Sequence, residues 1–459
     1  MPLLDPRDPR PIHFVGIAGA GMSGLAELFA RRGAAITGCD ANPAAAADLE
    51  RLGVRVTTHD PAHVDGARAL VVTSAMPQTH PEITRARELG IPVIRRAEAL
   101  GEVTVGRELI GIAGTHGKTT TTVMTATALT GAGRAPTALA GGRVSLWEGN
   151  LLAGNDTLFV VEADEYDRSF LALSPTVAVV TSIEADHLDI YRDLADIRTA
   201  FEQFVRGARA IVLCADDRGA DTLPTPSSTE VFRYGISSDD ARVRAVGVEL
   251  RPNGSVFDLT FDDDRLSEVR LAVPGVHNVL NALAALSAGI TVGADVPGMI
   301  RGLEGYRGVE RRFQRLGEAA GIAVVDDYAH NPGKVRAVLA TARVAFPDRR
   351  LVVAFQPHLF TRTRDFAEEF GQALAVADVI LLTDIYPARE QPIDGVTSAL
   401  VQKAVERYGA DVAWCGPRSR LAEALASRVL PGDIVLTVGA GDITITGPEL
   451  LTMLRARAA

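Results

Sequence analysis

One short stretch constrains the fold of this chain more than any other. An apolar run, residues 108–113, leads directly into Gly114-Thr115-His116-Gly117-Lys118-Thr119-Thr120, and a helix-compatible segment follows. The order strand, glycine loop, helix gathers backbone N–H groups at a helix N-terminus, where they bind phosphate. In such a loop Lys118 reaches the outer phosphates and Thr119 offers its hydroxyl to a magnesium ion. The stretch predicts a nucleotide-binding α/β domain.

The spacing of this loop departs from the strict Walker pattern. That pattern requires a glycine five residues before Gly117, and Ile112 stands there. A glycine-rich turn of structural purpose is therefore the alternative. The use of lysine argues against it, because the chain has only Lys118, Lys334 and Lys403 among 47 basic residues. A compact ammonium is a better point-charge ligand for phosphate than the guanidinium that the chain uses elsewhere.

Bulk composition narrows the class of protein. A chain of 459 residues is too long for one hydrophobic core, and 47% hydrophobic with 23% charged residues is ordinary for a globular protein. The net charge of −10 argues against general nucleic-acid binding. The three cysteines have no metal-site spacing, which favours reduced thiols and a cytoplasmic location. No run of 18 apolar residues and no signal peptide is present, so we expect no membrane insertion.

A second glycine loop lies near the start of the chain. The strand 12–17 runs into Gly19-Ala20-Gly21-Met22-Ser23-Gly24 and a helix through Arg32, and Asp40 follows the next strand, 35–39. The spacing satisfies G-x-G-x-x-G, which indicates a strand–turn–helix that accepts a pyrophosphate. An NAD-dependent oxidoreductase and a binder of another nucleotide both remain open. A third strand, 69–72, places Thr73 and Ser74 at the ligand edge of the same sheet, and this unit is complete near residue 106.

Acidic residues follow the next strands. The strand 157–161 runs into four carboxylates within 162–167, a pattern typical of the acidic partner of a phosphate loop, which fixes the metal. A solvated acidic turn is the alternative, but Glu162 directly follows the apolar run and fits it poorly. His187 lies among three acids after the strand 176–181, which favours ligand chemistry over core packing.

The remaining chain predicts an antiparallel set and a further parallel sheet. Alternating strands in 243–273 suggest hairpins beside the main sheet. Asn278 and Asn281 share one face near a helix start, where they either bind ligand or cap and solvate the helix. We place a domain boundary near residue 307. After it, predicted strands alternate with helix-length segments; these strands are 322–325, 351–355, 379–382 and 434–438. Charged loops after these strands indicate a site at one edge of a mostly parallel, doubly wound sheet.

With these segments collected, the chain resembles the Mur ligases over nearly its whole length. The likeness is carried by motifs in every unit, and with two further motifs it points to the alanine-adding branch and its close relative, the muropeptide-recycling branch. The family motifs are Gly114–Thr120, Glu162–Glu165, Glu184–Asp189, His277-Asn278, Arg311–Phe313 and Asp326–Pro332; the branch motifs are Phe355–His358 and Gly19–Met22.

The resemblance implies an α/β fold of three domains. These are a Rossmann-like UDP-sugar-binding domain over 1–106, a central P-loop ATPase over 107–307 with a mostly parallel sheet plus antiparallel strands, and a Rossmann-like amino-acid-binding domain over 308–459. It implies UDP-N-acetylmuramate, L-alanine and ATP as substrates, Mg²⁺ as cofactor, amide formation through an acyl phosphate, and a monomer or homodimer. By the same resemblance the first glycine loop binds UDP pyrophosphate and not NAD.

The resemblance also implies roles for individual residues. The catalytic set is Lys118, His187, Arg312, His358 and Arg362; the ATP-binding set is Gly114, Thr115, His116, Gly117, Lys118, Thr119, Thr120, Asn278, Asn281, Arg312 and Asp327; the UDP-sugar set is Gly19, Ala20, Gly21, Met22, Asp40, Thr73 and Ser74; and the metal set is Thr119, Glu162 and His187. Two departures stand out. Leu359-Phe360 replaces an Arg-Tyr pair of some relatives, and residues 188–333 contain no lysine, so the carbamylated lysine of sister ligases has no counterpart there.

Overall fold

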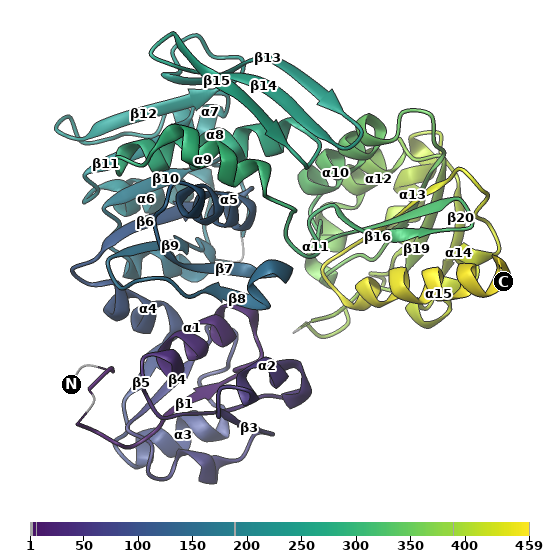
Figure 1. Ribbon diagram of the computed structural model, residues 1–459. Helices are drawn as coiled ribbons and strands as arrows, with labels where there is room; N and C mark the ends of the chain where they lie inside the picture. Colours follow the sequence, from purple (N-terminus) through teal and green to yellow (C-terminus); the bar gives the residue numbers. More distant parts are fainter. Residues whose placement is uncertain (1–2, 6, 188–189, 389, 459) are drawn as a thin grey trace. The chain divides into compact units, whose positions relative to one another are not determined.

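The computed structural model describes residues 3–5, 7–187, 190–388 and 390–458. The described strands form three sheets, and the chain divides into two compact units (Figure 1). One unit comprises Met1–Val248, Val256–Leu271 and Asn278–Val309, and the other Glu249–Ser255, Ala272–His277 and Glu310–Ala459. The predicted α/β class with mostly parallel sheets is confirmed.

The first sheet is parallel throughout and has the order β3-β2-β1-β4-β5. The chain builds outward from β1 in one direction and then returns to add β4 and β5 on the other side, so the order reverses at β1. The loop after β1 therefore lies at the topological switch point, where doubly wound sheets bind ligands. The elements are β1 Ile12–Val15, α1 Ala20–Arg31, β2 Ile36–Cys39, η1 Pro43–Ala46, α2 Ala47–Glu50, β3 Arg55–Thr57, η2 Pro61–Val64, β4 Ala69–Val72, α3 Pro81–Glu88, β5 Val93–Arg95 and α4 Arg96–Thr104.

The second sheet has ten strands in the order β15-β14-β13-β12-β11-β10-β6-β9-β7-β8. Its centre is parallel and apolar, and β6, β9, β10 and β11 are almost entirely buried. Its strands are β6 Glu108–Ala113, β7 Thr137–Val144, β8 Gly149–Leu152, β9 Leu158–Glu162, β10 Val177–Val180, β11 Ala210–Cys214, β12 Glu230–Gly235, β13 Val243–Arg251, β14 Gly254–Phe261 and β15 Asp264–Leu271. The antiparallel set expected beside the main sheet instead continues it, because β13 hydrogen-bonds to β12 in parallel.

Helices position the phosphate loop within this domain. The helices are α5 Lys118–Gly131, η3 Ser145–Trp147, η4 Tyr166–Ala172, α6 Leu194–Val205, α7 Arg218–Asp221, α8 Val276–Thr291 and α9 Val296–Glu304. Helix α5 follows β6 directly and packs closely on α9, since a Cβ on Gly131 would lie 2.5 Å from Gly302 Cα. The helix that carries Lys118 is thus held by the sheet and by a close helix–helix contact.

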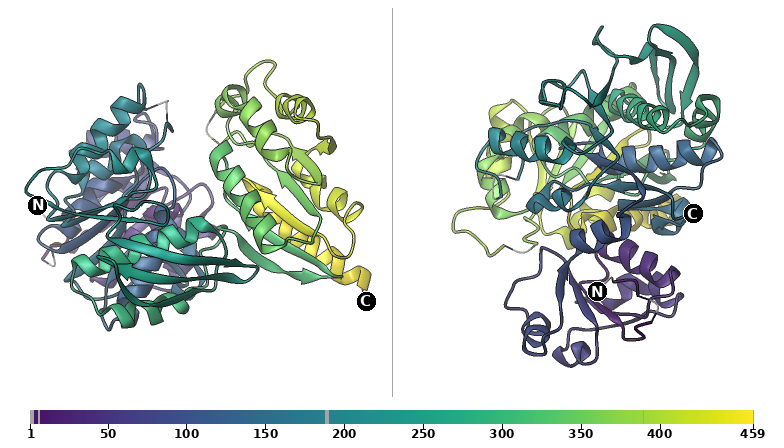
Figure 2. Two further views of the ribbon diagram at one scale, coloured as in Figure 1. Left: turned by 90° about the horizontal axis from the view of Figure 1, so that it is seen from above. Right: turned by 90° about the vertical axis from the view of Figure 1, so that its left-hand side faces the viewer.

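The third sheet has the order β16-β17-β21-β18-β19-β20 and is parallel except for β16. Alternate residues of its strands enter two separate cores: Val325 and Phe355 pack toward α10, α12 and α13, and Val324 and Ala354 toward α14 and α15. Figure 2 shows the strands of this unit between two layers of helices. The elements are β16 Gln314–Ala319, β17 Ile322–Asp327, α10 Pro332–Ala345, β18 Leu351–Phe355, α11 Phe360–Asp365, α12 Ala367–Leu374, β19 Val379–Thr383, α13 Ala399–Arg407, β20 Val412–Gly416, η5 Arg418–Arg420, α14 Leu421–Ala426, β21 Ile434–Val438, η6 Asp442–Ile445 and α15 Thr446–Ala458.

Among the helices that the structure describes, none combines the length and the apolar character needed to cross a membrane.

Candidate active site

The loop before α5 has the backbone of a phosphate loop. Gly114 has φ 139° and Gly117 has φ 81°, in the region that favours glycine. Gly117 is the residue before the first turn of α5, and a Cβ there would lie 2.5 Å from Asn281 Oδ1. Both glycines are therefore required by conformation and by close contact, and they aim the N-terminal N–H groups of α5 at one point.

The end of strand β10 holds this loop in place. Thr115 N donates to Ser182 O at 2.9 Å and His116 N donates to Ser182 Oγ at 3.0 Å. Thr181 Oγ1 in turn donates to His116 O at 2.5 Å. The loop is thus anchored to a neighbouring strand of the sheet before any ligand binds.

Lys118 lies in a buried ion pair. Its Nζ donates to Gly114 O at 2.8 Å and to the two Glu165 carboxylate oxygens at 2.8 and 2.5 Å. Burial alone would raise the pKa of Glu165, but the Lys118 ammonium and a hydrogen bond from His187 outweigh it and lower the pKa to about 2. For Lys118, burial opposes and the surrounding carboxylates outweigh it, so its pKa is raised. Lys118 is therefore a permanent cation at the loop.

The metal set divides into two neighbouring groups. Thr119 Oγ1 donates to Glu162 Oε1 at 3.1 Å, and Glu162 Oε2 accepts from Gly141 N at 2.6 Å. His187 instead has Nε2 3.6 Å from Glu165 Oε1, on a strained backbone with φ 55°. Thr119 and Glu162 offer the oxygen donors that Mg²⁺ prefers. Within the described residues, no compact group of three histidine, cysteine or acidic donors joins Glu162 to His187. Magnesium binding by His187 stays a prediction, and Leu188 and Asp189 of the same motif lie outside the described residues.

The two asparagines of α8 are buried, with 7% of Asn278 and 6% of Asn281 exposed. Thr121 Oγ1 in α5 donates to Asn281 Oδ1 at 3.1 Å. The reading in which both residues solvate the helix start is therefore excluded. Asn281 joins α8 to the start of α5, beside Gly117, while contact with adenine stays a prediction.

The glycine loop after β1 is hydrogen-bonded to the end of β2. Gly16 N and Ile17 N donate to Cys39 O at 2.8 and 3.1 Å, and Ala18 N donates to Asp40 Oδ2 at 3.0 Å. Asp40 thus holds the loop that leads to Gly19, the residue before α1. Thr73 and Ser74 follow β4 beside this loop, since a Cβ on Gly16 would meet the Thr73 methyl group at 3.4 Å.

The remaining loop glycines serve close contacts. A Cβ on Gly21 would lie 3.2 Å from the Arg96 guanidinium, so a positive charge flanks the N-terminus of α1. A Cβ on Gly24 would touch Asn150 of β8 at 3.4 Å, so α1 packs on the β7–β8 hairpin. The Met22 side chain is 98% buried, which leaves little of it for a ligand.

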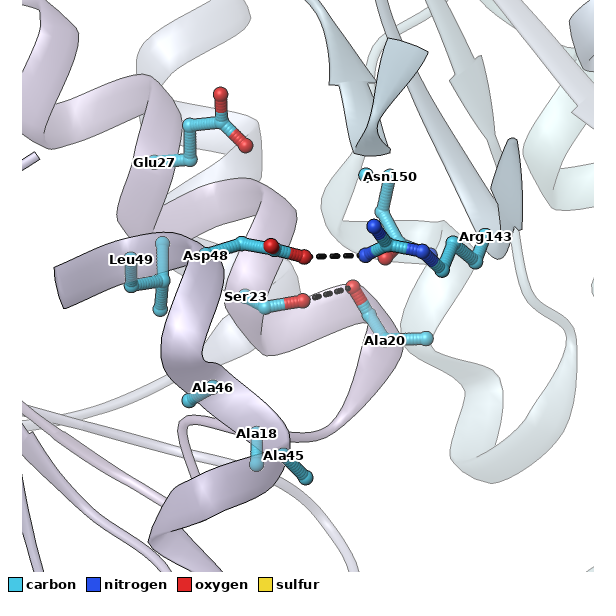
Figure 3. A pocket seen from close by; sticks show the side chains of 11 residues that line it. Ala18, Ala20, Ser23, Glu27, Ala45, Ala46, Asp48, Leu49, Arg143 and Asn150 are labelled. Atoms are coloured by element: carbon cyan, nitrogen blue, oxygen red, sulfur yellow. Dashed lines mark hydrogen bonds and ion pairs between the residues drawn. The ribbon is translucent and has the colours of Figure 1, made fainter. Parts of the chain in front are cut away.

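A cavity of about 210 Å³ opens between α1, α2 and the β7–β8 hairpin (Figure 3). Arg143 reaches across it from the hairpin to pair with Asp48 of α2. The residues that line the cavity are Ala18, Ala20, Ser23, Glu27, Ala45, Ala46, Asp48, Leu49, Arg143, Gly149 and Asn150. The cavity therefore adjoins the glycine loop, and the central domain contributes Arg143 to it, paired with Asp48.

A second group of polar side chains lies at the carboxyl edge of the third sheet. The guanidinium groups of Arg311 and Arg312 lie 4.8 and 5.2 Å from the centre of the Tyr328 ring. Asp327 is buried and accepts from Phe313 N and Ala329 N, both at 2.7 Å. Burial raises the pKa of Asp327 to about 6, although Arg312 and these two hydrogen bonds lower it. Arg312 and Asp327 thus lie near each other, while their contact with the nucleotide stays a prediction.

His358 and Arg362 also meet in this group. Arg362 Nη1 lies 3.4 Å from His358 Nδ1, and the His358 ring stacks on Tyr386 with 5.8 Å between ring centres. Arg311, Phe313 and Leu359 have positive φ values of 61°, 47° and 71°, which is strained for residues with side chains. Arg311 and Phe313 belong to one predicted motif and Leu359 directly follows another, and backbone strain gathered in this way is typical of a functional site.

Comparison with known proteins decides the family. The profile of the Mur ligase family catalytic domain matches residues 11–107, the Mur ligase middle domain 112–289, and the Mur ligase glutamate ligase domain 311–441. The chain is 45% identical over 458 residues to the UDP-N-acetylmuramate–L-alanine ligase of Kineococcus radiotolerans, covering 97% of this chain and 96% of the relative. The corresponding ligase of Acidothermus cellulolyticus is 44% identical, covering 99% of this chain and 98% of the relative.

The chain belongs to the Mur ligase family.

Solved structures agree with this assignment. A UDP-N-acetylmuramate–alanine ligase from Thermotoga maritima has a TM-score of 0.83 at 29% identity, covering 98% of this chain and 100% of that chain. A murein peptide ligase from Psychrobacter arcticus has a TM-score of 0.73 at 25% identity, covering 97% of this chain and 99% of that chain. The predicted three-domain Mur ligase fold is confirmed.

The structure of this Mur ligase adds polar residues that the sequence analysis did not single out. Glu165 was only one of four clustered carboxylates, and nothing in the sequence marks it as the partner of Lys118. No sequence motif marks Arg96, Arg143 or Asp48. Arg143 lies in the β7–β8 hairpin, which was not predicted. Arg96 could have been found from its position, because it is a charged residue that directly follows the strand β5.

Proposed function

We propose that this enzyme joins L-alanine to the lactate carboxylate of UDP-N-acetylmuramate and converts ATP to ADP and phosphate in the same reaction. The observation that carries the proposal is Lys118 at the N-terminus of α5, paired with the buried Glu165, in a chain matched over nearly its full length by ligases named for that reaction. Because phosphoryl transfer depends on positioning and charge neutralisation, a rigid loop with a permanent cation is the part that it most needs.

The reaction has two steps. The lactate carboxylate attacks the γ-phosphate of ATP, so an acyl phosphate forms and ADP leaves. The amine of L-alanine then attacks the acyl carbon, the amide bond forms, and phosphate leaves. We assign the ATP phosphates to the loop 114–120, where Lys118 neutralises charge and the α5 N–H groups orient the oxygens. Thr119, Glu162 and His187 would hold a magnesium ion, which would supply further neutralisation of the phosphate charge.

We assign the UDP-sugar to the glycine loop after β1 and the adjoining cavity. The loop N–H groups at α1, with Arg96 beside Gly21, suit a pyrophosphate. In the cavity, Arg143 offers hydrogen-bond donors and Asp48 offers hydrogen-bond acceptors, which suit the hydroxyl groups of a sugar. In the third domain, we assign Arg312 and Asp327 to the transferred phosphoryl group and His358 with Arg362 to the alanine. The domain limits 1–106, 107–307 and 308–459 remain our proposal, supported by the three matched profiles.

The muropeptide-recycling reaction is the second candidate. It is favoured by one observation, the likeness to the Psychrobacter arcticus murein peptide ligase. That ligase and the alanine-adding enzymes differ in the amino donor, so the two functions are separable by substrate. We further propose that the enzyme acts in the cytoplasm, which its scattered cysteines fit. We also propose that it is a monomer or a homodimer.

The deciding experiment measures ADP release with UDP-N-acetylmuramate and Mg²⁺. We expect fast ADP release when L-alanine is the amino donor. ADP release should be much slower when a tripeptide of the recycling kind replaces L-alanine. ADP release with the tripeptide but not with L-alanine would instead assign the recycling reaction. ATP binding without release under either condition would refute both. Positional isotope exchange in ATP, dependent on the muramyl substrate and independent of alanine, tests the acyl phosphate separately.

A further inference from the structure

A cluster of histidine, cysteine and glutamate side chains, the residue types that bind transition metals, lies in the first domain. It gathers around Glu82 of α3, on the face of the first sheet that α3 covers (Figure 1). Four of the chain's nine histidines and one of its three cysteines belong to it. The members are His13 of β1, Cys39 of β2, His59, His63 of η2, His80 and Glu82.

Glu82 is a buried carboxylate without a strong cationic partner. Its side chain is fully buried, and none of the described arginines or lysines lies within ion-pair distance of it. Asp60 N donates to Oε1 at 2.9 Å, and the other close neighbours are the Cys39 thiol and three imidazole rings. A buried charge is unfavourable unless it is paired or coordinates a metal. Glu82 is therefore a site where a cation would be strongly favoured.

Three donor atoms already stand at coordination spacing. Cys39 Sγ lies 2.9 Å from Glu82 Oε2 and 3.1 Å from His59 Nδ1, and His59 Nδ1 lies 3.5 Å from Glu82 Oε2. Around tetrahedral zinc, with bonds of about 2.0–2.3 Å, neighbouring donors are roughly 3.3–3.6 Å apart. The nitrogen–oxygen separation falls within this range, and the two separations that involve sulfur are shorter by roughly 0.2–0.7 Å, a gap that a small outward movement of the side chains would close on binding.

An unpartnered ring nitrogen points to the fourth ligand. His80 Nδ1 is buried, has no hydrogen-bond partner in the described structure, and lies 3.8 Å from Glu82 Oε2. The His80 and His59 rings are 4.8 Å apart. His13 Nε2, on a ring 1% exposed, is likewise without a partner. Buried ring nitrogens of this kind have lost their hydrogen bonds to water and gained no other partner. A bond to a metal ion would compensate for that loss.

We propose that Cys39, His59 and Glu82, with His80 as the fourth ligand, bind one Zn²⁺ ion. Thiolate and imidazole donors select zinc over magnesium, which prefers oxygen ligands. On binding, the Cys39 S–H bond breaks, sulfur bonds to the metal, and the proton leaves to solvent. The His59 side chain is 30% exposed and provides the entry path.

The ion would tie together three segments far apart in sequence: the end of β2, the loop after β3 and the start of α3. It would also stiffen the strand end from which the glycine loop hangs, since Gly16 N and Ile17 N donate to Cys39 O. The cysteine spacing in the sequence shows no such site, because the sheet and not a local motif brings the ligands together.

The test uses the full chain, stripped of metal and held in excess Mg²⁺, titrated with Co²⁺ as a visible probe for the zinc site. We expect one equivalent to bind, with a thiolate-to-cobalt charge-transfer band that Zn²⁺ abolishes by displacement. Cys39→Ser should lose the band. Cys415→Ser, which removes an exposed thiol elsewhere, is the matched control and should keep it. No band in the wild type, or an equal band in Cys39→Ser, overturns the proposal.

A second variant keeps the test decisive if Cys39→Ser does not fold. His59→Gln alters a partly exposed ligand and leaves the buried core intact. We expect its Zn²⁺ affinity, measured by competition with a chromophoric chelator, to fall at least tenfold, with an unchanged circular dichroism spectrum. Zn²⁺ affinity equal to that of the wild type would show that His59 is not a ligand and would refute the assigned site.

Discussion

Replacing Glu165 by glutamine tests whether the ion pair at the phosphate loop stabilises the central domain. The carboxylate is 3% exposed, and both of its oxygens lie within 2.8 Å of Lys118 Nζ. Glutamine keeps the shape and removes the charge. The Lys118 ammonium would then remain buried with the Gly114 carbonyl and the more exposed Asp164 for compensation.

Two routes give the magnitude. The pKa of Glu165 falls from an ordinary 4.5 to about 2. At about 1.4 kcal/mol for each tenfold change in proton affinity, this difference corresponds to about 3 kcal/mol. Independently, removing one partner of a buried ion pair destabilises proteins by about 3–5 kcal/mol. We therefore expect Glu165→Gln to lower the free energy of unfolding by about 3 kcal/mol at neutral pH.

The dependence on pH has a definite sign. Because the pKa is lowered in the folded state, the stabilisation is fully present above pH 4.5 and is lost as the pH falls toward 2. The difference between wild type and Glu165→Gln should therefore be constant between pH 5 and 7. It should shrink by about 1 kcal/mol by pH 4.

Urea unfolding followed by circular dichroism, without nucleotide, measures these differences. Lys118→Met and the double variant complete a double-mutant cycle, which isolates the pair from the effects of each side chain alone. We expect the double variant to be more stable than the sum of the single changes predicts by about 2 kcal/mol or more. A loss below about 1 kcal/mol in Glu165→Gln, or strict additivity, would refute a strong ion pair, since exposed pairs contribute only that much.

Three further predictions follow from the same geometry. Arg143→Ala breaks a half-exposed ion pair with Asp48, so the free energy of unfolding should change by less than about 1 kcal/mol while the KM for the UDP-sugar rises several-fold; an unchanged KM removes Arg143 from the cavity's function. Gly117→Ala places a Cβ 2.5 Å from Asn281 Oδ1 and should raise the KM for ATP at least tenfold, whereas Gly133→Ala, also at positive φ but with open space around it, should leave KM unchanged and reduce stability by about 1 kcal/mol. Asp327→Asn removes a carboxyl whose pKa is raised to about 6. The wild type should therefore lose about 2 kcal/mol relative to the variant as pH rises from 4 to 6.5, which urea unfolding at both pH values would reveal.

The parts of the fold that could be predicted are those with a local signal. Buried parallel strands such as β6 and β18 are continuous apolar runs that end in polar loops, and the sequence shows both features. The strands that were missed lack that signal. β16, Gln314–Ala319, is half-exposed and mixed in polarity, and β3 has three residues. The β7–β8 hairpin contains a register shift, so its residues do not alternate regularly.

The candidate site divides in the same way. The phosphate loop was predictable because its chemistry lies within seven consecutive residues, 114–120. The choice of Glu165 as partner of Lys118 was not, because a run of acids does not show which carboxylate turns inward. The cluster around Glu82 is the extreme case. Its proposed ligands come from three segments, and only the packing of α3 against the first sheet brings the end of β2 and the start of α3 together.

Glu165 and Asp327 show why such side chains must be judged by their partners and not by their positions. Both are buried carboxylates at the end of an apolar strand or just beyond it, and burial raises the pKa of each. Glu165 faces an ammonium at 2.5 Å, which reverses the effect of burial. Asp327 has two backbone N–H donors and the guanidinium of Arg312, and these do not suffice, so its pKa stays raised at about 6. The two residues must therefore respond oppositely to pH: acid weakens the fold through Glu165 and strengthens it through Asp327. Opposite slopes in the two variants, measured against wild type under one set of conditions, would establish that the nearest full charge decides the sign.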